Sequence, residues 1–282
     1  MACLLGGALG AADAPSGKVA LSESLEAWKK EIESGGARIA MARVYVRNGS
    51  YVLPADVDFR DLLLQLFSQY DFRAQFTLAH ALNVNLDQPT RRLGFVLLNM
   101  ERLKNSRESE EAIVAHELGH IWLHQRGFRA PPVVPGALAC EAIHMGDAVQ
   151  HVLIRRELTR RGVEFRPGWV QDLDAAYAAI AKQPLATAPA PDLCARLQRL
   201  AQVIDLRLGL PDGEWKNRVK YEERLLAADP LLVELVDRLV RLLNALDLEN
   251  RIDYYAGLGA VRSASTLLIQ QLVEKARPAV VP

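Results

Sequence analysis

The stretch from Glu110 to Gln125 constrains this chain more than any other, because it contains the pentapeptide His116-Glu117-Leu118-Gly119-His120. On an α-helix, residues four apart lie one above the other on the same face, so His116 and His120 can present two imidazoles to one cation. Glu117 is rotated about 100° from His116, which places its carboxylate beside such a cation. The pentapeptide therefore predicts a helical metal site with a carboxylate next to it.

The residues around the pentapeptide support a buried helix. Apolar side chains recur at roughly helical spacing at Ile113, Val114, Leu118, Ile121 and Trp122. Glu110 and Glu111 stand near the N-terminal end, where negative charge complements the helix dipole, and Gly127 follows where a helix stop is expected. Gly119 would let another segment approach closely. The alternative is a buried helix whose two histidines hydrogen-bond to core carbonyls.

The form H-E-x-x-H, with a predicted strand before its helix, resembles the zincin metallopeptidases over Leu93 to about Arg161. The resemblance implies one Zn²⁺ ion per chain, held by His116, His120 and a third group, and a peptide or protein substrate. It also implies that Glu117 is the general base that accepts a proton from the attacking water. In that fold the strand beside the active-site helix is typically a sheet edge to which a peptide can add. Leu93–Met100 is the nearest candidate for that strand, and Phe76–Leu86 is the alternative.

The third ligand must come from farther along the chain, because a catalytic zinc usually has three protein ligands and one open position. The sequence from His120 onward does not follow the pattern H-x-x-G-x-x-H. We therefore look for the third ligand on the predicted helix 140–161. On that helix Asp147 and His151 are four residues apart and share one face. One of them could bind zinc while the other orients a ligand histidine. The candidates in order are Asp147 and His151 together, then Glu141, then His144. A polar stripe that faces solvent is the alternative.

The pattern of apolar residues predicts an α+β chain. Helices are expected over 21–34, 59–70, 110–125 and 140–161, and strands over 39–46, 51–53, 76–86 and 93–100. Further helices are expected over 171–182, 191–208, 215–228, 231–246 and 263–275, with 254–259 as a possible cleft loop. We therefore expect a zincin-like catalytic domain with a small mixed or antiparallel sheet over 18–165, followed by a mostly helical region over 166–282. His80 falls on the apolar side of strand 76–86, where a core histidine is expected rather than a metal ligand.

Composition narrows the range of partners. The 34 basic and 34 acidic residues among 282 give a formal net charge of zero, and no basic block stands out, so a nucleic-acid partner is not expected. Half of the residues are apolar, yet no run approaches the roughly 18 consecutive apolar residues that indicate a transmembrane helix.

The first residues and the cysteines bear on the compartment. Residues 1–17 resemble the second half of a secretory signal, with Ala12-Asp13-Ala14 as a cleavage site but without a basic region before it. This pattern predicts a truncated signal and a secreted or periplasmic protein. The alternative is an Ala/Gly-rich leader on a cytoplasmic one. Cys140 and Cys194 could pair in an oxidising compartment or remain as buried thiols.

Two other functions fit the same residues. The chain could be a non-catalytic or regulatory binding module with a zincin-like fold. It could also be a metal-dependent amidase that acts on a non-peptide substrate.

Overall fold

The structure of the chain is a computed structural model that describes residues 16–47, 50–69, 79–85, 92–130, 139–182, 193–227 and 229–276. Within these ranges, the side chains of 47, 69, 85, 139–143, 272–273 and 275–276 are not among those described. Residues 1–15 of the predicted leader and residues 131–138 lie outside the described residues.

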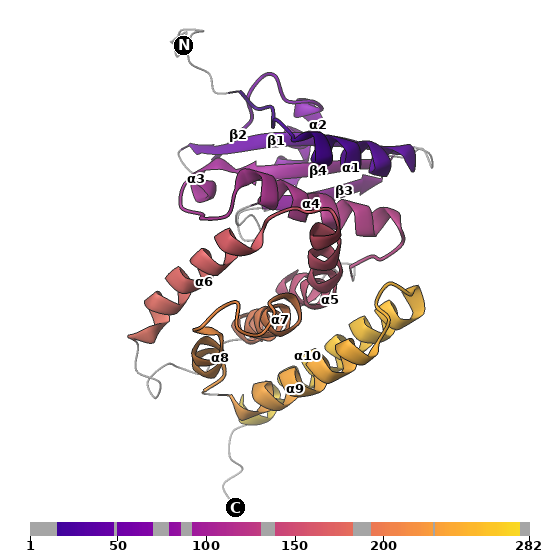
Figure 1. The fold of residues 1–282 in the computed structure, drawn as a ribbon. Coiled ribbons are helices and arrows are strands. Elements are labelled where there is room, and N and C mark those ends of the chain that lie inside the picture. The colour runs from indigo at the N-terminus through magenta and orange to yellow at the C-terminus, as the bar shows by residue number, and fades with distance from the viewer. Residues whose placement is uncertain are drawn as a thin grey trace, which may run out of the picture. The chain divides into compact units, whose positions relative to one another are not determined.

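The chain divides into two compact units, Met1–Asn105 and Ser106–Pro282, which are described separately below. The first unit contains α1 (Glu23–Ser34), β1 (Ala37–Arg47), β2 (Ser50–Val52), α2 (Arg60–Gln69), β3 (Ala79–Asn85), β4 (Arg92–Asn99) and α3 (Met100–Leu103). The second contains α4 (Glu110–Gln125), α5 (Ala139–Arg160), α6 (Arg166–Ala181), α7 (Leu193–Gly209), α8 (Arg218–Leu226), α9 (Pro230–Ala245) and α10 (Arg251–Ala276). The predicted α+β class, with a largely helical C-terminal part, is confirmed (Figure 1).

The sheet of the first unit is mixed and has the strand order β2-β1-β4-β3. β1 and β4 run parallel, whereas β2 pairs antiparallel with β1 and β3 pairs antiparallel with β4. Residues 93–99 of β4 are all buried, as expected for a strand with neighbours on both sides and both faces covered. The prediction that Leu93–Met100 forms a sheet edge is therefore wrong, because β4 lies between β1 and β3. In the described part of the sheet, β3 is the outer strand on that side.

The core of the first unit lies on both faces of this sheet. Buried side chains of β1 and β4, Phe95 among them, pack with Leu63 of α2. α1 contacts β1 and buries Leu25, Trp28 and Ile32, three residues whose spacing places them on one face of a helix. His80 is half-buried on β3, and burial lowers its pKa, which agrees with the expected core role.

The second unit is organised around α5, which packs against α4, α7 and α10. Because α4 packs on α5, the helix with the H-E-x-x-H residues groups with the helical region rather than with the sheet. The division between compact units accordingly falls after Asn105, whereas the sequence predicts a domain boundary between 165 and 166.

α4 begins and ends at the residues its sequence indicates. The Ser109 side chain accepts a hydrogen bond from the backbone N–H of Ala112 at 3.1 Å, an N-cap interaction that precedes the two glutamates of the first turn. At the other end, Gly127 takes a positive φ of 87°, and the Phe128 N–H donates to the Leu123 carbonyl at 2.9 Å. This closure is typical of helix C-termini. Most of α4 is buried on every side, as expected for a core helix.

Gly119 permits the close crossing of α4 and α5. A Cβ at this position would lie 2.8 Å from Cγ2 of Ile154, closer than non-bonded carbons approach. The absence of a side chain at Gly119 therefore brings the two histidines of α4 close to α5, as the sequence suggested.

The expected cleft loop at 254–259 is wrong, because these residues belong to α10, which begins at Arg251. Tyr254 and Leu258 are buried, and a Cβ at Gly257 would lie 2.9 Å from Cδ2 of Leu243 on α9. Gly257 and Gly259 suggested a loop because glycine has a low helix propensity. At Gly257, close packing against α9 leaves no room for a side chain, and the helix forms in spite of that low propensity. The helix expected over 263–275 is the second half of α10.

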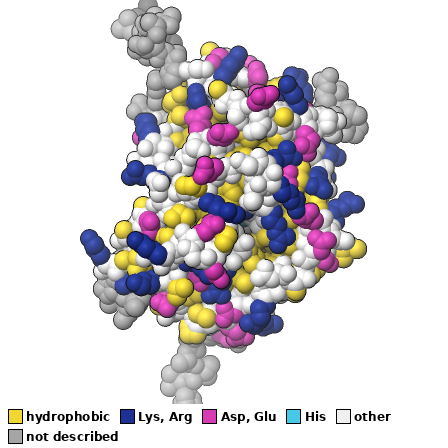
Figure 2. All heavy atoms as spheres, viewed as in Figure 1, with side chains coloured by type: hydrophobic (Ala, Val, Ile, Leu, Met, Phe, Trp, Pro, Cys, Tyr) yellow, Lys and Arg dark blue, Asp and Glu magenta, His cyan; other side chains and the backbone are white. Residues whose placement is uncertain are grey.

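None of the described helices has the length and apolar character needed to span a membrane. On the face shown in Figure 2, basic and acidic side chains are interspersed, in keeping with a formal net charge of zero.

Candidate metal centre

Three imidazoles from two helices meet in the second unit. His116 and His120 on α4 and His151 on α5 each offer a ligand atom, and these atoms all lie within 4.8 Å of one another. The ring centroids are 5.1 Å apart for His116 and His120, 4.7 Å for His116 and His151, and 5.4 Å for His120 and His151. The group could hold a divalent metal ion, for which imidazole nitrogen is a common ligand.

Among the four candidates for the third ligand, the structure places His151 in this group and Asp147 beside it. Asp147 Oδ1 lies 3.6 Å from His151 Nε2, and its other oxygen lies 3.9 Å from His144 Nδ1. His144 is partly buried and belongs to no such group among the described residues. The side chain of Glu141 lies outside those described.

Glu117 follows His116 on α4, and the residue as a whole is 9% exposed. Helix geometry rotates it about 100° from His116. The structure thus keeps this residue buried on the helix that carries His116 and His120.

Gln150 determines which nitrogen of His120 faces the cluster. His120 Nδ1 lies 3.0 Å from Gln150 Oε1, while Gln150 Nε2 donates to the Phe128 carbonyl at 3.0 Å and to the Tyr254 hydroxyl at 3.2 Å. The Tyr254 hydroxyl in turn donates to the Arg129 carbonyl at 3.1 Å. Because the amide nitrogen already donates twice, Oε1 must accept, so Nδ1 of His120 carries the proton. Nε2 is then the unprotonated nitrogen of this imidazole.

His151 has a carboxylate behind it. Its Nδ1 lies 3.5 Å from Asp205 Oδ2 on α7, and Arg155 donates to both Asp205 oxygens, at 2.7 and 2.6 Å. The Arg155 guanidinium also stacks over the Trp169 ring, 3.4 Å from its centroid. A carboxylate that orients a ligand histidine through its second nitrogen is a common feature of zinc sites.

Burial and neighbouring charge set the ionisation of these groups. Burial, together with His151 and His120, lowers the pKa of His116 well below its usual value, which keeps this imidazole neutral as metal binding requires. Burial opposes ionisation of Asp205, but Arg155 outweighs it and holds the pKa of this carboxyl well below its usual range. Burial alone would lower the pKa of His151, but Asp147 and Asp205 together raise it. A metal ion would therefore compete with a proton at His151.

Burial also raises the pKa of two carboxyl groups near the cluster. The pKa of Asp147 is raised by burial, an effect that His151 and His144 partly offset. The pKa of Glu108, just before the cap of α4, is raised to about 7 because burial outweighs the attraction of Arg155.

Sequence reasoning does not identify Gln150, Asp205 or Glu108. For Asp205 a signal was present, because it follows Ile204 and precedes Leu206 in an apolar run of α7. A carboxylate in such a run needs a buried partner, and a search for that partner leads to Arg155 and then to His151. Gln150 and Glu108 carry no comparable signal.

Comparisons of the chain with family models, with curated proteins and with solved structures give no match. The functional argument therefore depends on the geometry and chemistry of the residues described above.

Proposed function

We propose that this chain is a zincin-type, zinc-dependent metallopeptidase in which His116, His120 and His151 hold one Zn²⁺ ion and Glu117 is the general base. The observation that supports the proposal most strongly is the third imidazole, which α5 brings to the H-E-x-x-H pair. Two histidines on one helix are common in proteins, whereas a third from another helix with its own carboxylate is what a zinc site requires.

The residues fit zinc in three respects. Burial keeps His116 neutral, and the Gln150 amide oxygen accepts a hydrogen bond from His120 Nδ1, which makes Nε2 the unprotonated nitrogen. Asp205 lies behind His151 Nδ1 and orients that imidazole. Nitrogen donors of this kind suit zinc better than calcium or magnesium, which prefer oxygen. When bound, zinc lowers the pKa of a coordinated water to about 7 and polarises a carbonyl group.

Glu117 provides the proton transfers of the reaction. Its carboxylate accepts the proton released as water attacks the peptide carbonyl, and it then delivers that proton to the leaving amine. Buried Gln150 and Asp205 do not react, but they hold the imidazoles of His120 and His151 in place.

The test compares zinc content with peptide cleavage in one set of proteins. The zinc-loaded wild type should cleave members of a peptide library, and a chelator should abolish the cleavage. Glu117→Gln should retain one zinc per chain and lose about 10²- to 10⁴-fold in rate, the usual contribution of a general base. Glu111→Gln, an exposed carboxylate on the same helix, should behave like the wild type. Full activity in Glu117→Gln would refute the proposal.

The other two functions correspond to different outcomes of this experiment. Stoichiometric zinc without cleavage of any peptide would favour a zinc-containing binding module. Hydrolysis restricted to small non-peptide amides would favour an amidase.

We further propose that the protein works in an oxidising compartment, secreted or periplasmic. The supporting observation is that Cys194 is disulfide-bonded, since structural disulfides are rare in the cytosol. Peptide mapping under non-reducing conditions on protein from a fractionated native host should find this disulfide in the extracytoplasmic fraction. A fully reduced Cys194 in a cytoplasmic fraction would contradict the proposal.

A further inference from the structure

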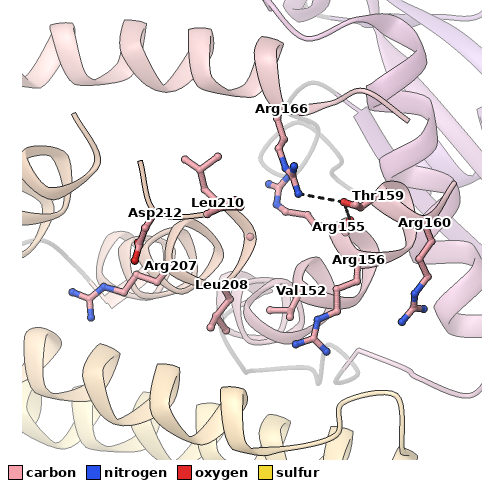
Figure 3. Close-up of a pocket in the computed structure, with 12 residues that line it drawn as sticks. Val152, Arg155, Arg156, Thr159, Arg160, Arg166, Arg207, Leu208, Leu210 and Asp212 are labelled. Atoms are coloured by element: carbon pink, nitrogen blue, oxygen red, sulfur yellow. Dashed lines mark hydrogen bonds between the residues drawn. The ribbon is translucent and has the colours of Figure 1, made fainter. Parts of the chain in front are cut away.

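A pocket beside α5 is lined by none of the three histidines of the candidate metal centre. This pocket of about 470 Å³ is lined by residues of α5, by the first residue of α6 and by the end of α7 with the turn after it (Figure 3). Its wall carries five arginines: Arg155, Arg156, Arg160, Arg166 and Arg207. Such a concentration of guanidinium groups around one pocket needs a physical explanation.

Part of this charge is neutralised by the protein itself. Arg160 pairs with Glu157 and Glu249, and Arg207 pairs with Glu222 at 2.8 Å and with Asp237 at 2.5 Å. These carboxylates do not line the pocket. The one carboxylate that does, Asp212, pairs with Arg218.

Three arginines retain hydrogen-bond donors that no described residue uses. Arg155 donates to Asp205 through Nε and Nη2, and its Nη1 has no acceptor in the described chain. Arg156 is exposed and has no ion-pair partner among the residues that the structure describes. Arg166 pairs with Glu214 through Nη1 at 3.4 Å and donates to Thr159 through Nη2, but its buried Nε has no acceptor. Figure 3 shows this side chain extending from α6 toward Thr159 and Arg155 on α5.

We propose that the pocket binds a small organic phosphate. Guanidinium groups bind phosphate through paired, charge-assisted hydrogen bonds, and donors from two helices can surround its several acceptor oxygens. The volume lies in the range of small-ligand sites, about 300–1,000 Å³. Val152, Leu208 and Leu210 complete the wall and provide apolar contact for the organic part of the ligand.

This site does not depend on the proposed peptidase function. Arg155 is the residue common to both, because it lines the pocket and also holds the Asp205 carboxylate behind His151. Phosphate binding can be measured without zinc or peptide, so failure of either proposal leaves the other standing.

The experiment is calorimetric titration of the zinc-free full chain with phenyl phosphate, with benzoate as the carboxylate of similar size. We expect saturable binding of one phenyl phosphate per chain, tighter than that of benzoate. Arg156→Gln and Arg166→Gln should each weaken binding about tenfold, or about 1.4 kcal/mol. Arg262→Gln is the control, because it removes the same charge from an exposed position on α10, outside the pocket.

Circular dichroism and thermal unfolding establish that each variant is folded, which is expected because Arg156 is exposed and Arg166 is partly exposed. The proposal is overturned if phenyl phosphate does not bind saturably or if benzoate binds more tightly. It is also overturned if Arg262→Gln weakens binding as much as the two pocket variants do.

Discussion

Replacing Asp205 with Asn tests whether a carboxylate behind His151 organises the metal centre. Asn has nearly the same size as Asp but lacks its charge. In the wild type, the Asp205 oxygens accept from Arg155 at 2.7 and 2.6 Å, and one of them lies 3.5 Å from His151 Nδ1. The substitution therefore changes two interactions of one buried group.

The substitution should lower both the stability of the fold and the affinity for zinc, and each effect has its own measurement. Arg155 would be left buried without a counter-charge, which costs about 3–5 kcal/mol of unfolding free energy in comparable buried pairs. His151 would lose the group that orients it, and such losses lower metal affinity about 10- to 100-fold. Urea unfolding of the zinc-free protein measures the first, and competition with a chromophoric zinc chelator measures the second.

Asp229→Asn separates these effects, because Asp229 forms the same kind of pair elsewhere in the unit. It accepts from Arg196 at 2.5 and 2.9 Å, and its side chain is 7% exposed compared with 12% for Asp205. Asp229→Asn should lose a similar amount of stability and keep wild-type zinc affinity. If both variants retain wild-type zinc affinity, Asp205 is only a partner of Arg155 and the reasoning about His151 fails.

Two further predictions concern packing and pH. Gly119→Ala should destabilise the protein by about 1–3 kcal/mol in urea unfolding, because the new Cβ would contact Ile154, and Ile154→Ala should restore part of the loss. Gly259→Ala, where nothing lies within 4 Å of the new Cβ, should instead stabilise α10 by up to about 1 kcal/mol; equal effects at the two glycines would contradict the close crossing. Because burial raises the pKa of Glu108 from its usual 4.5 to about 7, the folded state binds this proton more tightly than the unfolded chain does. The unfolding free energy should therefore fall as pH rises from about 5 to 8, by up to about 3 kcal/mol. The raised pKa values of Asp147 and His151 contribute in the same direction, so Glu108→Gln should reduce this dependence and Glu111→Gln should not; an unchanged pH slope in Glu108→Gln would contradict the assignment.

The parts of the fold that the sequence predicts well are those decided by local pattern. The bounds of α4 agree with the two early glutamates and with Gly127, which takes the positive φ of a helix C-terminus. The face of α1 that carries Trp28 follows from helical spacing. The i, i+4 relation of His116 and His120 likewise requires nothing outside one helix.

The parts that the sequence does not predict depend on contacts between distant segments. Asp147 and His151 share one face of α5, so helical spacing cannot choose between them, and only the crossing with α4 places His151 with the other two histidines. Asp205 reaches His151 from α7, a relation that no spacing along the chain encodes. The position of β4 inside the sheet depends on its pairing with both β1 and β3.

Zinc stoichiometry in two α5 variants tests the central claim most directly. Equilibrium dialysis followed by elemental analysis should find one zinc per chain in the wild type and in Asp147→Asn, and almost none in His151→Ala at the same free zinc concentration. Retention of zinc by His151→Ala together with its loss from Asp147→Asn would contradict the three-histidine centre and identify Asp147 as the third ligand.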